Sequence, residues 1–274
     1  MPASALGLAL SAAVVHALWN LLLARARDPQ AAGAVAVVAG VAIWAPVALA
    51  TGGMTTRALP YVPASAAFEL AYWAMLGLAY RIGELSVTYP LARGMAPVLL
   101  LLAGLAGLGG AIGGLQVAGV ALVAVGIVAV RGMRARGGVP EVALAAGIAA
   151  CIASYTLIDR AALHHADPIA YLWLVLALTA PPYVVAMVRI RGREALRASI
   201  TPAVVGTGIA MFGSYVLALA ALQRASAAAV GAVRETSVVL VTAFAAAVLH
   251  EDVGPVRAAG AVLVTAGIVL IALG

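Results

Sequence analysis

The sequence predicts an all-α polytopic membrane protein whose ten transmembrane helices form two inverted five-helix repeats. Three observations support this prediction: the composition, a series of long apolar runs, and an internal repeat. Hydrophobic residues make up 65% of the chain and charged residues only 9%. Soluble domains are about 45–50% apolar and about 25% charged, so this chain has too few charges to cover the surface of a soluble protein.

Apolar runs bounded by charge, Pro or Gly predict the ten spans, each about 20 residues long. In the first half they are Ser4–Ala24, Ala31–Thr51, Tyr61–Tyr80, Leu85–Gly107 and Gly114–Arg131. In the second half they are Glu141–Ile158, Pro168–Arg189, Pro202–Leu222, Ala227–Leu249 and Pro255–Leu273. The loops are short, so we divide the chain into a first repeat, residues 1–131, a linker, 132–140, and a second repeat, 141–274.

The internal repeat is visible when the chain is compared with itself at a fixed offset. Arg93 then aligns with Arg234, and two glycines align with two others, Gly119 with Gly260 and Gly126 with Gly267. Upstream, Asp28–Pro29 and Asp167–Pro168 each precede an apolar run. Because each repeat holds an odd number of spans, the second copy enters the membrane from the opposite side. Inverted repeats are typical of secondary transporters, whose binding site lies near the midplane between the repeats.

The loop arginines predict the orientation. All sixteen basic residues are arginines. One set of alternate loops holds eleven of them: Arg25, Arg27, Arg81, Arg131, Arg134, Arg136, Arg189, Arg191, Arg193, Arg197 and Arg257. The other set holds three: Arg57, Arg160 and Arg224. The positive-inside rule places the first set in the cytoplasm and both termini outside. We expect a multi-pass protein of the cell (inner) membrane, in contact with the lipid bilayer and with no nucleic-acid partner.

Two arginines inside predicted spans, Arg93 and Arg234, are the first candidates for substrate binding. A charge at the centre of a span costs about 2.5–3.5 kcal/mol, so it needs an explanation. Because the two arginines occupy matching repeat positions, they are expected at similar depths from opposite sides. One hypothesis is a cationic clamp for a carboxylate or phosphoryl oxygen. The other is an internal salt bridge, Arg93 to Glu69 or Arg234 to Glu235. Because adjacent helical residues point about 100° apart, Arg234 and Glu235 are expected to have different partners.

The acidic residues Glu69 and Glu235 are candidates for substrate binding and for proton coupling. A carboxyl group inside a span can exchange protons during transport. The alternative for Glu69 is a permanent ion pair with Arg93, since structural ion pairs also occupy buried sites.

Aromatic and polar residues complete the predicted site. His16 and Asn20 lie one helical turn apart, with Trp19 beside them. They either line a cavity or bond neighbouring helices together. The remaining wall candidates are Tyr89, Tyr155 and Tyr215.

Other motifs indicate packing rather than chemistry. The glycine pairs Gly119/Gly126 and Gly260/Gly267 each lie seven residues apart on one helix face, which predicts close contact between helices. The sequence HHADP at His164–Pro168 is interpreted as a solvated loop. No HExxH, phosphate-binding glycine loop or Ser/His/Asp spacing is present. We therefore predict no catalytic residue, no metal site and no cofactor.

Three motifs resemble the drug/metabolite transporter superfamily, EamA-type. They are HALWN at His16–Asn20, GELSVTYPLARGMAP at Gly83–Pro97, and the Gly-spaced stretch Leu249–Ile271. The chain departs from the family at Gly109–Gly110, where the family usually carries a Glu. The resemblance implies cytoplasmic termini, the reverse of the arginine count.

The resemblance implies a secondary transporter, an exporter working by alternating access. The paired arginines favour a small polar substrate that is anionic or zwitterionic, amino-acid-like or phosphonate-like, with protons as a candidate coupling ion. A monomer suffices for the predicted fold. There are two alternatives. The first is an intramembrane lipid-modifying enzyme, but the sequence shows no cluster of carboxylates and His at one membrane face that would support it. The second is a channel or structural membrane subunit.

Overall fold

The computed structural model describes the chain except for residues 83–84, 132–138, 238 and 241–253. Its described part is helical, apart from loops and one isolated β-bridge between Met54 and Ala166. The first half contains α1 (Ala3–Ala24), α2 (Pro29–Thr51), the 3₁₀ helix η1 (Thr56–Ala58), α3 (Tyr61–Ile82), α4 (Leu85–Leu105) and α5 (Gly114–Arg131). The second half contains α6 (Val139–Ala162), α7 (Pro168–Arg191), α8 (Arg193–Ala198), α9 (Pro202–Leu222), α10 (Ala227–Arg234) and α12 (Pro255–Leu273).

Six helices in the described ranges are long and apolar enough to cross a bilayer: α1, α2, α3, α6, α7 and α9. Three shorter apolar helical segments accompany them, Leu91–Leu105, Gly114–Ala129 and Ala258–Leu273. Many large apolar side chains face outward; Leu49 and Leu273, for example, are 70% and 72% exposed. An apolar exterior of this kind suits contact with lipid, and the chain is a multi-pass membrane protein.

The aligned Asp-Pro pairs start equivalent helices. Asp28 accepts a hydrogen bond from the Ala31 N–H at 3.1 Å at the start of α2, and Asp167 accepts one from the Ile169 N–H at 2.9 Å at the start of α7. In each case Pro follows at the first helical position, where its missing N–H costs nothing. Burial alone would raise the pKa of Asp28, but the Ala31 N–H and the Arg191 guanidinium, 2.7 Å away, outweigh it and lower the pKa.

Two predicted spans end four or more residues from the expected position, whereas the others end within two residues of it. The sixth was expected to stop at Ile158, but α6 continues to Ala162 because the Asp159 carboxylate is buried and hydrogen-bonded inside the bundle. The ninth was expected to run without interruption to Leu249, but α10 ends at Arg234, Glu235 forms a turn, and helical residues resume at Thr236. Its end is stabilised by the Thr236 hydroxyl, which donates to the Val233 carbonyl at 2.8 Å. The remainder of that span, from residue 241, lies outside the described residues.

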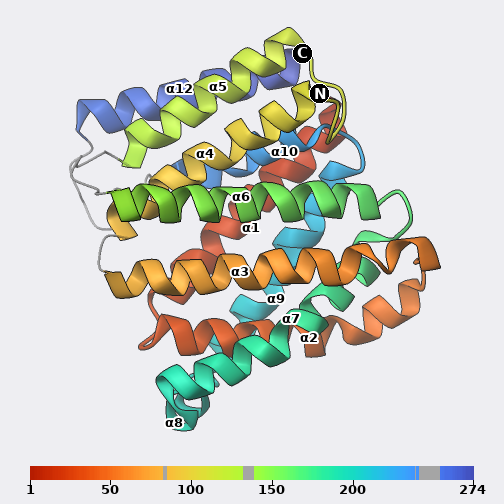
Figure 1. Cartoon of the computed structure of the whole chain (residues 1–274), viewed down its shortest axis with the longest axis vertical. Helices are drawn as coiled ribbons and strands as arrows, with labels where there is room; N and C mark the ends of the chain where they lie inside the picture. Colours follow the sequence, from red (N-terminus) through yellow and green to blue (C-terminus); the bar gives the residue numbers. More distant parts are fainter. Residues whose placement is uncertain (83–84, 132–138, 238, 241–253) are drawn as a thin grey trace.

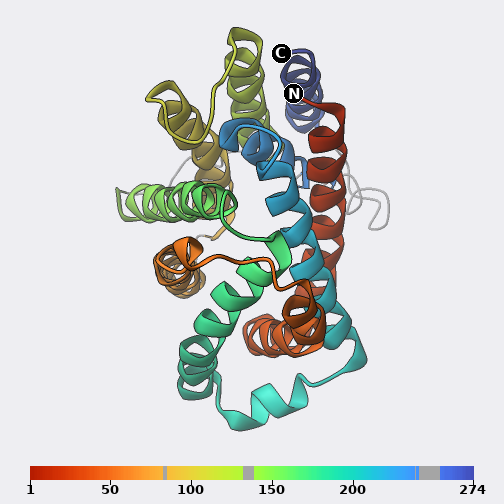
Figure 2. The ribbon, with the colours of Figure 1, turned by 90° about the vertical axis from the view of Figure 1, so that its right-hand side faces the viewer.

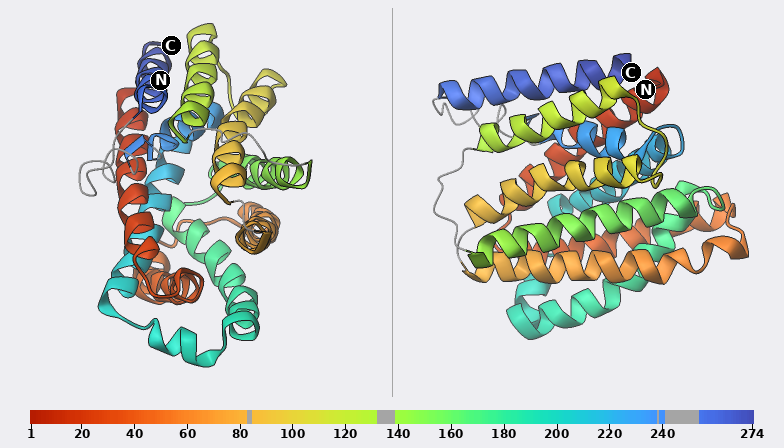
Figure 3. Two further views of the ribbon diagram at one scale, coloured as in Figure 1. Left: turned by 90° about the vertical axis from the view of Figure 1, so that its left-hand side faces the viewer. Right: turned by 45° about the horizontal axis from the view of Figure 1, so that its top comes forward.

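The predicted glycine contact joins α5 and α12, which lie side by side at one edge of the bundle (Figures 1 and 3). A Cβ added at Gly119 would lie 2.6 Å from the Gly267 carbonyl oxygen, and one added at Gly126 would lie 2.7 Å from the Gly260 carbonyl oxygen. The order of these contacts means that the two helices run antiparallel. The prediction that these glycines allow close helix packing is therefore confirmed.

Gly126→Ala is expected to destabilise the protein by about 1–3 kcal/mol, the usual cost of overpacking. The new methyl group would meet backbone atoms of α12, the Val264 nitrogen at 2.8 Å among them, so the helices must separate. Thermal unfolding of the purified protein in detergent measures the effect. Gly7→Ala in α1 is the matched control, because a Cβ added at Gly7 would have nothing within 4 Å. Equal unfolding temperatures for the two variants would contradict the prediction.

Among the other helices, α3 and α6 are neighbours at one side of the bundle, where Figure 2 shows them nearly end-on. At one end, loops from the two halves are joined by backbone hydrogen bonds. The Thr55 N–H donates to the His165 carbonyl at 3.0 Å, and the Ala227 N–H donates to the Gly109 carbonyl at 2.9 Å. The HHADP loop thus pairs with the α2–α3 loop, and the Gly109–Gly110 turn pairs with the start of α10.

Candidate functional site

A cavity of about 430 Å³ lies inside the bundle, within the size range of small-molecule sites. Its lining residues come from α1, α2, α3, α4, α6, α7, α9 and α10, so both halves of the chain contribute. The cavity extends to Ala24, Gln30 and Met187, near the ends of α1, α2 and α7 that adjoin arginine-rich loops.

Eight of the predicted site residues line this one cavity: His16, Trp19, Asn20, Glu69, Arg93, Tyr155, Tyr215 and Arg234. Glu235 lies behind them, in a small adjoining pocket that Arg93 and Arg234 also line. Tyr89 belongs to α4, but its side chain is outside the described residues. The structure therefore brings together residues that are far apart in sequence, and their role in binding stays a prediction.

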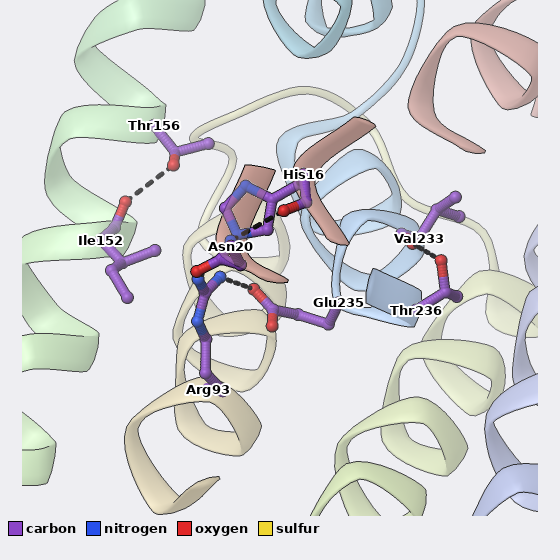
Figure 4. A network of polar contacts seen from close by, with 8 residues as sticks. All are labelled: His16, Asn20, Arg93, Ile152, Thr156, Val233, Glu235 and Thr236. Atoms are coloured by element: carbon purple, nitrogen blue, oxygen red, sulfur yellow. Dashed lines mark hydrogen bonds and ion pairs between the residues drawn. The ribbon is translucent and has the colours of Figure 1, made fainter. Parts of the chain in front are cut away.

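Arg93 on α4 is engaged in an ion pair across the two halves of the chain. Its Nη1 donates to Glu235 Oε1 at 2.8 Å, and its Nη2 lies 3.1 Å from His16 Nε2 (Figure 4). One form of the internal salt-bridge hypothesis joined Arg234 to Glu235, although neighbouring helical residues point about 100° apart and were expected to have different partners. In the structure the partner of Glu235 is Arg93.

Arg234, at the end of α10, has a different environment. Its Cζ lies 5.5 Å from the centroid of the Tyr215 ring, a cation–π contact. No carboxylate within the described ranges forms an ion pair with it. It also lines the cavity, so its charge is available to an anionic group there.

Glu69 on α3 is 4% exposed, and its Oε2 is buried without a hydrogen-bond partner among the described residues. The Tyr215 hydroxyl lies beside its carboxyl group. A buried carboxyl oxygen without a partner is costly, and this one belongs to a cavity-lining residue.

Asp159 was missed by the sequence prediction. This residue of α6 is 1% exposed and accepts three hydrogen bonds, from the hydroxyls of Ser65 at 2.6 Å, Tyr171 at 2.8 Å and Tyr215 at 2.6 Å. The sequence did carry a signal: a span of about 20 residues beginning at Glu141 extends to about residue 160. Treating Asp159 as the end of the apolar run excluded it.

Aromatic rings form much of the cavity wall. Tyr155 makes edge-on contacts with Tyr72 and Tyr215, at centroid distances of 6.5 and 6.2 Å. The Trp73 and Tyr183 rings, which were not in the predicted set, lie 4.4 Å apart. These faces provide apolar area beside the charged groups.

The HALWN residues both line the cavity and pack helices together. Trp19 Nε1 donates to Ser214 Oγ at 3.2 Å, which joins α1 to α9. Asn20 Nδ2 donates to the His16 carbonyl within α1 at 2.8 Å (Figure 4). The two hypotheses for this motif are therefore compatible.

Comparisons with known proteins identify the fold and the family. No curated protein matches the chain. One solved crystal structure is 18% identical, with a TM-score of 0.80 over 100% of this chain and 99% of that chain; at this identity it shows a shared fold alone. Residues 139–273 match the family model described as EamA-like transporter family, whose members are transporters rather than enzymes. The resemblance to EamA-type permeases of the drug/metabolite transporter superfamily is thus confirmed, by a family match that covers the second half of the chain.

Proposed function

We propose that the protein is a secondary transporter that exports a small anionic or zwitterionic metabolite, amino-acid-like or phosphonate-like, across the cell (inner) membrane by alternating access. The observation that carries this proposal is Arg234, which lines a cavity of about 430 Å³ without an ion-pair partner among the described residues. A guanidinium group is well suited to bind carboxylate or phosphonate oxygens. The described residues of one chain line the cavity, so a monomer suffices for the proposed function.

The architecture proposed for this mechanism is two inverted five-helix repeats. Under the exchange of halves, α1 corresponds to α6, α3 to α9, α4 to α10 and α5 to α12. The helix contacts support this exchange: α1 packs on α9 as α6 packs on α3, and α4 packs on α6 as α10 packs on α1. The same exchange of halves turns α5 into α12 and α12 into α5, so it leaves this antiparallel pair unchanged. A central site between such repeats is the arrangement that alternating access requires.

A counterflow assay tests the function. Proteoliposomes containing the purified protein are loaded with one unlabelled compound and exposed to the same compound in radiolabelled form, across a panel of amino acids and aminoalkylphosphonates. Saturable accumulation of label is expected for at least one compound. Unsaturable flux would support a channel instead, and no flux of any compound would reject the proposed function.

Proton exchange is the proposed driving force, with Glu69 and Glu235 as the proton-binding groups. Both are 4% exposed, and each has an Oε2 atom without a hydrogen-bond partner among the described residues. Glu69→Gln and Glu235→Gln are each expected to alter the pH dependence of counterflow, because an amide cannot exchange a proton. Glu194→Gln on α8, an exposed site outside the cavity, is the control. An unchanged pH profile in both variants would remove proton coupling from the mechanism.

A further inference from the structure

The Asp159 carboxylate determines how Tyr215 can interact with a ligand. Tyr215 lines the cavity, and its hydroxyl donates to Asp159 Oδ2 at 2.6 Å. A tyrosine hydroxyl has one proton to donate and lone pairs that accept. Because that proton is committed to Asp159, the hydroxyl can offer only its lone pairs to anything else nearby.

The other carboxylate oxygen fixes Asp159 itself. Oδ1 accepts from Ser65 on α3 at 2.6 Å and from Tyr171 on α7 at 2.8 Å. Hydrogen bonds to a charged acceptor are stronger than those between neutral groups, and Asp159 is 1% exposed. The carboxylate is therefore held in one orientation behind the cavity wall, with Oδ2 directed at Tyr215.

On the cavity side, the Tyr215 hydroxyl lies beside the Glu69 carboxyl group. Glu69 lines the cavity and has a buried Oε2 without a partner among the described residues. With the Tyr215 proton directed at Asp159, the Tyr215 and Glu69 oxygens adjoin each other as two acceptors, and Glu69 Oε2 accepts from no donor among the described residues. On the same aromatic ring, the Arg234 guanidinium supplies donors, 5.5 Å from the centroid.

We propose that Tyr215 and Glu69 form an acceptor subsite for an ammonium group of the substrate, and that Asp159 is the positioning residue that makes Tyr215 an acceptor. Arg234 then binds the acidic group of the same molecule. This inference rests on the proposed transport function and narrows its substrate class from anionic or zwitterionic to zwitterionic.

Substitutions at Asp159 and around it separate this role from simple helix packing. In Asp159→Asn, the amide oxygen can keep the Ser65 and Tyr171 hydrogen bonds while the NH₂ group donates to Tyr215, whose own proton then turns toward the cavity. Tyr215→Phe removes the acceptor but keeps the ring under Arg234. Tyr61→Phe is the matched control, because Tyr61, at the start of α3, is not among the described residues that line the cavity or donate to Asp159.

The test uses matched probe pairs that differ in the ammonium group: phenylalanine against 3-phenylpropionate, and 2-aminoethylphosphonate against ethylphosphonate. Binding is measured calorimetrically on the purified protein, and saturable uptake is measured in proteoliposomes. In the wild type we expect the ammonium-bearing member of at least one pair to bind at least about tenfold more tightly, as a charged hydrogen bond would give. Asp159→Asn and Tyr215→Phe should bring that ratio close to one, and Tyr61→Phe should preserve it.

Equal binding of both members to the wild type, or binding of neither, would overturn the inference. An unchanged affinity ratio of the two probes in Tyr215→Phe would also overturn the inference. This variant provides the test even if Asp159→Asn does not fold. Saturable uptake of the deaminated probes alone would reject the ammonium subsite and leave the transport proposal standing. The broader counterflow panel decides the transport function separately.

Discussion

Arg234→Ala is expected to reduce counterflow to background while the protein stays folded. The variant removes a cation that lines the cavity and has no ion-pair partner in the described part of the chain. Losing a charged hydrogen bond to the substrate costs about 1.5–3 kcal/mol, or roughly 10- to 150-fold in affinity. Counterflow in proteoliposomes gives the transport result, and thermal unfolding in detergent shows that the fold is retained.

Two further variants control the Arg234 experiment. Arg224→Ala removes an exposed arginine whose side chain bonds its own helix, and it should leave transport unchanged. Arg234→Lys keeps the charge but loses the planar fork, so an intermediate affinity is expected. Normal transport by Arg234→Ala would disprove the role of this residue in substrate binding.

Arg93→Ala is expected to act mainly on stability, although Arg93 occupies the equivalent repeat position. The substitution leaves the Glu235 carboxylate, 6% exposed at its side chain, without its ion-pair partner. Removing one member of a buried pair costs about 3–5 kcal/mol. A large drop in unfolding temperature is therefore expected for the purified protein.

A double-mutant cycle separates this effect from substrate binding. Arg93→Ala combined with Glu235→Ala removes both charges, so it should recover part of the stability lost in Arg93→Ala. If Arg93→Ala unfolds at the wild-type temperature yet fails to transport, Arg93 binds the substrate directly and the ion pair is not structural.

Much of the fold was predictable because its signals are local. Apolar runs and Asp-Pro helix starts depend on neighbouring residues, and the structure has helices at each predicted span, with part of the ninth outside the described residues. The contact between α5 and α12 was also predictable, because glycines seven residues apart on one face indicate packing wherever the partner lies.

The details of the site depend on contacts between distant segments, which spacing alone does not reveal. Glu235 pairs with Arg93, 142 positions away, whereas the sequence indicated only that Glu235 and its neighbour Arg234 have different partners. In the sequence, Asp159 looks like the polar end of a span. The three hydroxyls that stabilise it come from α3, α7 and α9, so the local sequence does not reveal them. The fold buries a carboxyl group that hydropathy alone counts as a boundary.

The glycine seam between α5 and α12 has a consequence for the origin of the chain. Gly119 meets Gly267, the repeat equivalent of Gly126, and Gly126 meets Gly260, the repeat equivalent of Gly119. Each of the two glycines of α5 therefore contacts the repeat equivalent of the other one. In a homodimer, such reciprocal contacts are characteristic of a two-fold symmetric interface. A gene encoding only five such helices would produce a protein able to dimerise with an upside-down copy of itself through this seam. Duplication and fusion of that gene would preserve the contact within one polypeptide.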